Sequence, residues 1–316
     1  MHPTRRFLLQ SAAAAGLGLA LPLRVWGLAS LGGHAFGSYW RVVAADEAAL
    51  AGVADLVDAI VAETDAAMSP YRAKSELTRI NRNSSTDWLP LSRGLNQVLR
   101  GAVAVATASG GAFDPTVGPI VGRYGFGPIR GLRVGDVGDL DLRGGTLRKG
   151  KPGLTLDLCG IAKGWALDRI VTALQGRGAT GFLVELGGEV AARGRHPAGR
   201  PWRIAVDGTD RAVELTDRAV ATSGDGVQAY GVGTNRYGHI IDPQRGLPAT
   251  GDLASVSVIA TEAMVADGWA TALFALGTDA ALGMAETQGL DTVLVVRDGA
   301  GYRILTTGGA DRRLLM

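Results

Sequence analysis

Residues 255–306 decide the fold class, and they read SVSVIATEAMVADGWATALFALGTDAALGMAETQGLDTVLVVRDGAGYRILT. The composition of Ser255–Ala260 predicts a strand, and the apolar spacing of Ala263–Leu276 predicts a helix that ends at Gly277. A short helix is expected next, over Asp279–Gln288. Two further strands are expected around a hairpin turn: Thr292–Val296 and Tyr302–Thr306, joined by Asp298-Gly299-Ala300-Gly301. Because strands joined by short turns alternate with helices, the pattern favours a mixed α+β fold over a regular parallel βαβ arrangement.

The same mixture extends toward the N-terminus. Apolar residues at helical spacing predict three more helices: Leu50–Met68, Ser92–Ser109 and Ile161–Leu174. Strand-like composition marks four more segments: Gly37–Ala44, Phe182–Leu186, Trp202–Val206 and Ala219–Thr222. We therefore expect an α+β fold of mixed, largely antiparallel sheets with flanking helices. Since no internal repeat or low-complexity linker interrupts the pattern, residues 30–316 are expected to form one domain.

Composition excludes several classes of protein. The chain has 316 residues, 47% of them apolar, which is enough for a sizeable core. The formal net charge is +2 and there is no long basic run, so nucleic-acid binding is not indicated. Cys159 is the single cysteine, which excludes an intramolecular disulfide, and the lack of a nearby histidine argues against a catalytic thiol. The 47 glycines indicate either many tight turns or close approach of backbone to a ligand.

The N-terminal residues 1–29 are interpreted as a targeting segment and linker. Arg5-Arg6 is followed by Phe7-Leu8 and by an apolar stretch that runs to about Leu23. Paired arginines before such a stretch resemble a twin-arginine export signal, and the stretch is short for a membrane span. We expect a periplasmic protein, with an uncleaved anchor at the inner membrane as the alternative.

Asp267 and Thr271 form the sharpest candidate site. They lie four residues apart in a predicted helix, so their side chains should share one face. A carboxylate beside a hydroxyl offers two hard oxygen ligands of the kind Mg²⁺ prefers. The alternative is an ordinary helical aspartate with a threonine packed beside it, and spacing alone does not separate the two. The carboxylate is expected at the surface of a cleft.

Three other residues suggest phosphate or proton chemistry. Asp157 precedes a turn into a predicted helix whose first residues include Lys163, and a helix N-terminus with a lysine suits a phosphate. His239 precedes Ile240-Ile241 and could accept a proton from a hydroxyl group, or could be a hydrogen-bonded structural histidine.

Seven segments in order resemble the ApbE family, the FAD:protein FMN transferases. They cover about residues 36–280 and comprise SPYRAKSELTRIN from Ser69, GAFDPTVGP from Gly111, DLCGIAKG from Asp157, ELGG from Glu185, ATSGD from Ala221, HIIDP from His239 and ADGWATAL from Ala266. The resemblance implies an ApbE-like fold with a flavin cleft, and a magnesium ion held by the Gly160 carbonyl, Asp267 and Thr271. It also implies that FAD contacts the following residues: Phe36, Tyr71, Ala112, Phe113, Asp114, Asp157, Lys163 and Ile241. His239 and Asp267 are the expected catalytic residues.

Three positions depart from the family pattern. Phe36-Gly37-Ser38 stands where Met-Gly-Thr is common, Cys159 where glycine is common, and Gly226 where an aromatic residue often follows Ser-Gly-Asp. Phe36 can still cover an aromatic ring, and none of the three changes removes an expected metal ligand.

The resemblance implies a reaction and a partner. Mg²⁺ would assist transfer of FMN from FAD to a threonine or serine hydroxyl of an acceptor protein, with AMP as the leaving group. The expected acceptor is a membrane respiratory flavoprotein of the Rnf, Nqr or NosR type. Two alternatives remain open: an FAD pyrophosphatase that releases FMN and AMP, and a non-catalytic flavin carrier or assembly factor.

Overall fold

The structure is a computed structural model that describes residues 23–25, 28–226, 229–232, 235–299 and 301–315. Arg5-Arg6, on which the export prediction depends, therefore lies outside the described residues, as does Ala300 of the predicted hairpin turn. In the part of the chain that is described, no helix is long and apolar enough to cross a membrane.

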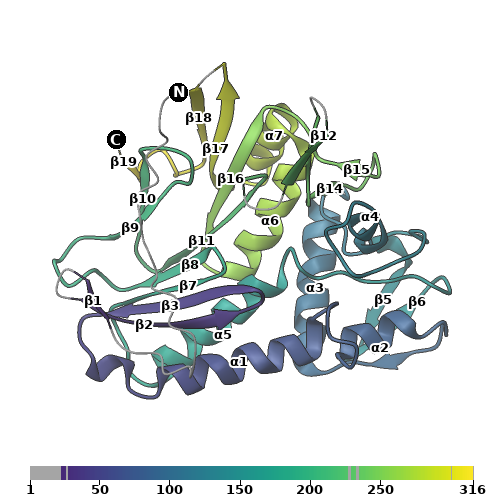
Figure 1. Ribbon diagram of the computed structural model, residues 1–316, viewed down its shortest axis with the longest axis horizontal. Coiled ribbons are helices and arrows are strands. Elements are labelled where there is room, and N and C mark those ends of the chain that lie inside the picture. The colour runs from purple at the N-terminus through teal and green to yellow at the C-terminus, as the bar shows by residue number, and fades with distance from the viewer. Residues whose placement is uncertain (1–22, 26–27, 227–228, 233–234, 300, 316) are drawn as a thin grey trace.

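A nine-stranded sheet forms the centre of the molecule (Figure 1). Its strands, in spatial order, are β1 (Leu23–Val25), β2 (Leu28–Ala35), β3 (Ser38–Ala44), β7 (Phe182–Leu186), β8 (Glu189–Arg193), β11 (Arg218–Gly224), β16 (Leu253–Ala260), β17 (Asp291–Asp298) and β18 (Gly301–Thr307). Each neighbouring pair in this order is antiparallel. The expected α+β fold with largely antiparallel sheets is confirmed.

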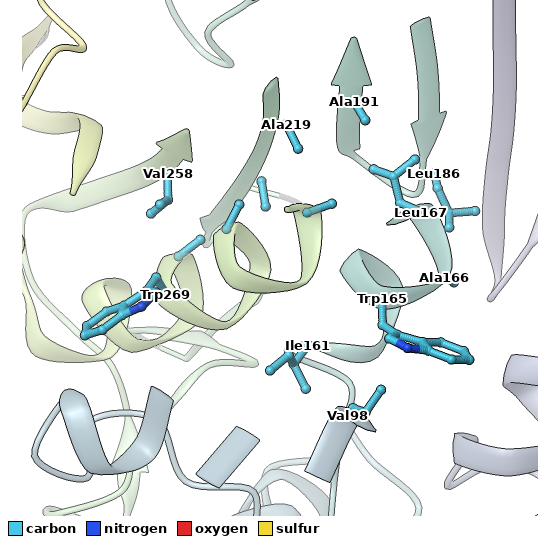
Figure 2. Packing of buried hydrophobic residues seen from close by; sticks show 14 of the residues in the cluster. Val98, Ile161, Trp165, Ala166, Leu167, Leu186, Ala191, Ala219, Val258 and Trp269 are labelled. Atoms are coloured by element: carbon cyan, nitrogen blue, oxygen red, sulfur yellow. The ribbon is translucent and has the colours of Figure 1, made fainter. Parts of the chain in front are cut away.

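Helices cover one face of this sheet. They are α1 (Val53–Met68), α5 (Ala162–Gly176), α6 (Ala263–Leu276) and α7 (Thr278–Thr287), and α3 (Arg93–Ala108) packs against α6 from the far side. Ala191 of β8, Ala219 of β11 and Val258 of β16 belong to the apolar core beneath the strands, together with Trp165 and Trp269 of the helices (Figure 2). Burial of this apolar surface is the main force that holds α5 and α6 against the sheet.

The opposite face of the sheet carries a second, smaller core. A three-stranded sheet of β9 (Trp202–Ala205), β10 (Ala212–Leu215) and β19 (Leu314–Leu315) packs there. In β11, Val220 belongs to this second core whereas its neighbours Ala219 and Ala221 face the helices. This alternation follows from the two-residue period of a strand and explains why both faces of the central strands are apolar.

Smaller elements lie beside α3 at one end of the molecule (Figure 1). They are α2 (Glu76–Arg82), α4 (Gly118–Arg123), the sheet of β4 (Leu89–Pro90), β5 (Leu140–Arg143) and β6 (Thr146–Lys149), the hairpin of β12 (Ala229–Val232) and β13 (Asn235–Gly238), and the hairpin of β14 (Ile241–Asp242) and β15 (Leu247–Pro248). Two 3₁₀ turns, Ala48–Leu50 and Val137–Asp139, complete the elements.

Two predicted boundaries were wrong for reasons of backbone conformation. The helix expected from Leu50 begins at Val53, because Gly52 adopts a left-handed conformation with φ of 65°. The strand expected from Gly37 begins at Ser38, because Phe36 and Gly37 form a two-residue hairpin turn with φ of 51° and 74°. The predicted strand Phe182–Leu186 and helix Ala263–Leu276 have the bounds of β7 and α6.

Candidate functional site

Helix α6 presents Asp267 and Thr271 to the turn that leads into α5. The Asp267 Oδ2 atom accepts a hydrogen bond from the Gly164 amide at 3.0 Å, and the Thr271 Oγ1 atom donates one to the Gly160 carbonyl at 3.3 Å. The Ser223 hydroxyl lies 3.4 Å from Thr271 Oγ1. The structure thus brings the three predicted metal ligands onto one side of the same turn.

Gly160 is glycine because this turn and α6 are in close contact. A Cβ atom at this position would lie 2.9 Å from Thr271 Oγ1 and 3.3 Å from the Phe113 ring. Any side chain here would push the turn away from α6. Phe113, predicted to contact FAD, therefore packs beside Gly160, one of the predicted metal ligands.

Asp267 is buried, with 4% of its surface exposed, so the expectation of a carboxylate at the surface was wrong. Burial raises its pKa, and the nearby Lys163 ammonium opposes that shift. The Lys163 Nζ atom donates to Glu189 Oε1 at 2.6 Å and to the Gly187 carbonyl at 3.4 Å. Burial lowers the pKa of Lys163, but Glu189 and Asp267 raise it more, so the net shift is upward.

Glu189, which the sequence analysis missed, completes a cluster of two carboxylates and one ammonium. It is 3% exposed, and burial raises its pKa to about 7 against the opposing charge of Lys163. Within the described residues, its Oε2 atom has no hydrogen-bond partner. Its position directly after Glu185-Leu186-Gly187-Gly188 was the available signal. With both carboxylates ionised, the cluster carries an excess of negative charge, which favours a bound cation.

Asp157 shapes the start of the turn. Its Oδ1 atom accepts from the Cys159 amide at 3.0 Å, and its own amide donates to the Pro115 carbonyl at 2.7 Å. Desolvation by the surrounding protein and the charge of Asp157 raise the pKa of Cys159 well above its usual value. Although the residue is exposed at the surface, both effects disfavour the thiolate, which is the nucleophilic form of cysteine.

Tyr71 lies close to this turn. Partial desolvation by the neighbouring protein raises the pKa of its hydroxyl, and the negative charge of Asp157 raises that pKa further. The Tyr71 hydroxyl donates to the Phe126 carbonyl at 3.0 Å, while 65% of the residue remains exposed. An exposed ring beside Asp157 is available to contact a planar ligand.

His239 lies at the edge of a group of aromatic side chains. Its ring centroid is 6.3 Å from that of Phe126 in an edge-on arrangement, and Phe126 stacks on Tyr230 at 5.3 Å. Tyr237 stacks on Tyr230 at 5.6 Å and on Tyr124 at 6.0 Å. The described contacts thus place His239 beside Phe126, whose carbonyl binds Tyr71.

The remaining predicted residues have varied surroundings. Ala112, Phe113 and Ile241 are buried, and Phe36 lies at the tip of the β2–β3 hairpin. Asp114 is also buried, and both of its oxygens accept from protein donors: Oδ1 from the Thr116 amide at 2.8 Å and Oδ2 from the Arg133 guanidinium. Asp114 therefore has a structural partner that the sequence analysis did not foresee.

The predicted magnesium site does not consist of a cluster of acidic and histidine side chains. Within the described residues, no group of three or more His, Cys, Asp and Glu side chains is arranged to hold a metal ion. The predicted ligand set contains one carboxylate, one hydroxyl and one backbone carbonyl, so it does not depend on such a group.

The chain is similar to known proteins over most of its length. Residues 36–294 match the model of the ApbE family. A FAD:protein FMN transferase from Haemophilus influenzae is 33% identical over 321 aligned residues, which cover 92% of this chain and 93% of the relative. The structure of the flavin transferase ApbE from Vibrio cholerae has a TM-score of 0.80 and 30% identity, and the match covers 93% of this chain and 100% of that one. The apo form of the Pseudomonas stutzeri flavinyl transferase ApbE has a TM-score of 0.82 and 33% identity over 90% of this chain and 96% of that one. This chain therefore belongs to the ApbE family.

Proposed function

We propose that this chain transfers the FMN half of FAD to a threonine or serine hydroxyl of another protein and releases AMP. The observation that carries the proposal is the match to the FAD:protein FMN transferase of Haemophilus influenzae at 33% identity over 92% of this chain and 93% of the relative. The convergence of two distant segments supports it: Asp157, Gly160 and Lys163 belong to one segment, and Asp267 and Thr271 belong to another that follows roughly 100 residues later.

The residues present fit a magnesium ion. The Gly160 carbonyl, the Asp267 carboxylate and the Thr271 hydroxyl are hard oxygen donors, and the two buried carboxylates exceed the one nearby ammonium in charge. These three residues would hold Mg²⁺, and the ion would neutralise negative charge on the pyrophosphate of FAD.

The chain's own residues account for the rest of the reaction. The acceptor hydroxyl oxygen forms a bond to the FMN phosphorus, and the bond between that phosphorus and the oxygen bridging to AMP breaks. His239 takes the proton of the hydroxyl as general base, and AMP leaves with the bonding electron pair. Lys163 places a positive charge beside the same turn and favours the pyrophosphate of the substrate.

The experiment that tests the proposed function measures the products of FAD. The purified protein is incubated with FAD and MgCl₂, with and without a candidate acceptor, and AMP, free FMN and protein-bound FMN are quantified by chromatography. A transferase gives AMP and bound FMN in equal amounts only when the acceptor is present. Free FMN and AMP without acceptor would indicate a pyrophosphatase, and binding of FAD without any products would indicate a carrier.

The compartment and acceptor are part of the proposal. Arg5-Arg6 and the apolar stretch after it support twin-arginine export to the periplasm, where the outer-facing part of an Rnf, Nqr or NosR-type flavoprotein would be accessible. Replacement of both arginines with lysine should retain the protein in the cytoplasm, as measured by cell fractionation. Unchanged periplasmic accumulation of that variant would contradict the export assignment.

A further inference from the structure

Arg133 connects two segments of the site that are far apart in sequence. It lies in the loop between α4 and β5, and only 19% of its side chain is exposed. Its Nε atom donates to Thr116 Oγ1 at 3.1 Å, its Nη1 atom donates to the Pro243 carbonyl at 2.9 Å, and its Nη2 atom pairs with Asp114 Oδ2. All three guanidinium nitrogens thus have a partner, and the partners come from two segments.

The first segment is the turn that contains Asp114 and Thr116. It lies between two predicted FAD-contacting elements, because Phe113 packs beside Gly160 and the Pro115 carbonyl accepts from the Asp157 amide at 2.7 Å. A displacement of this turn would therefore act directly on Asp157 and on the packing beside Gly160.

The second segment runs from His239 to Pro243 and includes β14. The hairpin that β14 and β15 form has only two residues in each strand, and its turn is held internally by Asp242, which accepts from the amides of Gln244 and Arg245. Such a small hairpin contributes little stability of its own. The Arg133 bond to Pro243 therefore ties this hairpin to the turn at Asp114.

The chemistry of this link requires arginine. A guanidinium is a planar group with donors in three directions, whereas a lysine ammonium is a point charge at the end of a flexible stem. A lysine could pair with the buried Asp114 carboxylate but could not also reach both Thr116 and Pro243. Replacing Arg133 with lysine therefore keeps the positive charge beside Asp114 but removes the hydrogen bonds that set the spacing of the two segments.

We propose that Arg133 is a positioning residue for flavin transfer, which sets the spacing between the Phe113–Thr116 turn and the His239–Pro243 segment. The inference rests on the proposed function, since FAD is expected to contact Phe113 and Ile241 on the two segments. Arg133 acts through these neighbours and touches no reacting atom.

The decisive variant is Arg133→Lys, which keeps a positive charge beside Asp114 and removes the planar guanidinium that also binds Thr116 and Pro243. We expect a KM for FAD that rises by roughly tenfold to a hundredfold, with a smaller change in kcat and a matching loss of FAD affinity measured by flavin fluorescence. Amide hydrogen exchange should increase in residues 112–117 and 240–249 and stay unchanged in α3. Arg203→Ala removes an arginine that pairs with Glu214 at 3.1 Å on the other face of the sheet, and it serves as the control with unchanged KM.

A second pair of variants separates positioning from charge balance. Arg133→Ala leaves Asp114 buried without its counter-charge and should lose stability, and adding Asp114→Asn should restore folding. Because Asp114 is itself expected to contact FAD, the reference is the single variant Asp114→Asn, and the double variant should bind FAD more weakly than this reference. Equal affinity in these two variants, or wild-type KM and exchange in Arg133→Lys, would overturn the inference. Failure of the wild-type protein to bind FAD would instead count against the proposed function, while the exchange measurement would still decide whether Arg133 holds the two segments.

Discussion

The hydroxyl of Thr271 donates a hydrogen bond to the carbonyl of Gly160 across 3.3 Å, and so joins the middle of α6 to the turn before α5. One helical turn earlier, Asp267 accepts from the Gly164 amide at 3.0 Å. The two contacts hold the helix and the turn in register, and they place a carboxylate, a hydroxyl and a carbonyl side by side. The structure thus gives Asp267 and Thr271 different partners, which their spacing in the sequence alone does not reveal.

Asp267→Asn should abolish FMN transfer while the protein remains folded. The asparagine carbonyl can still accept from Gly164, but the only formal negative charge among the three proposed ligands is lost. Removing the ionised group also removes the desolvation cost that raises the pKa of Asp267, so we expect no loss of stability without metal. Transfer is measured by the acceptor's mass and folding by circular dichroism. Full transfer by the folded variant would show that Asp267 is not a ligand.

Thr271→Val should lower transfer less severely and raise the Mg²⁺ concentration needed for half-maximal rate. Valine has nearly the volume of threonine but loses the hydroxyl that bonds to Gly160. Thr271→Ser is the matched control, because it keeps the hydroxyl and should retain most of the rate. Equal magnesium requirements for the valine variant and the wild type would remove Thr271 from the proposed ligand set.

His239→Ala should slow transfer without a change in the Mg²⁺ requirement. The histidine lies beside Phe126, whereas Asp267 and Thr271 contact Gly164 and Gly160. Loss of a general base typically costs roughly 10²–10⁴-fold in rate. Single-turnover rates at several magnesium concentrations check this expectation. A rate near that of the wild type would rule out His239 as the base, and a shifted magnesium requirement would assign it to the metal site.

Local sequence signals predicted the long helices and several strands well. Ser92 was expected to begin a helix, and its hydroxyl accepts from the Leu95 amide at the start of α3. The helix α2 was not predicted, although Ser75 caps it by accepting a hydrogen bond from the Thr78 amide. The strand β2 was not predicted, and only its first two residues, Leu28 and Ala29, overlap the predicted targeting segment and linker.

The sequence pattern did not predict contacts between residues that are far apart in the chain. The strand β3 pairs with β7, about 140 residues away, and nothing in either strand specifies the partner. The same holds for the ion pairs of Arg133 with Asp114 and of Lys163 with Glu189, which depend on the assembled fold. The shared face of Asp267 and Thr271 was predictable because it follows from helix geometry alone.

The stability of α6 should depend on pH through Asp168 of α5. Its carboxylate accepts from the amides of Ala263 at 2.7 Å and Met264 at 2.9 Å, which begin α6, whereas Glu262 at the N-cap position makes no side-chain capping bond. Burial raises the pKa of Asp168 from 3.8 to about 6, against the opposing effect of these two hydrogen bonds. Between these two pH values the folded state holds a proton that the unfolded state has lost, so this contribution to stability falls as pH rises.

Asp168→Asn should remove that contribution. The difference in unfolding free energy between wild type and variant should change by roughly 2–3 kcal/mol between pH 4 and pH 7, in the direction of a relatively less stable wild type at the higher pH. Urea unfolding at intervals across this range measures the difference, and comparison with the variant cancels the titration of other groups. A difference that is constant with pH would show that Asp168 keeps an ordinary pKa.

The most direct test of flavin transfer is the intact mass of an acceptor after incubation with this protein. A purified Rnf-, Nqr- or NosR-type flavoprotein subunit is incubated with FAD, MgCl₂ and either the wild-type chain or Asp267→Asn, and a version of the subunit with its acceptor threonine replaced by alanine serves as the control. We predict that the wild-type chain adds the mass of one FMN less water to the unaltered subunit, and that neither the Asp267→Asn reaction nor the control subunit gains mass. FAD cleaved to free FMN and AMP with no change in the subunit's mass would contradict the account.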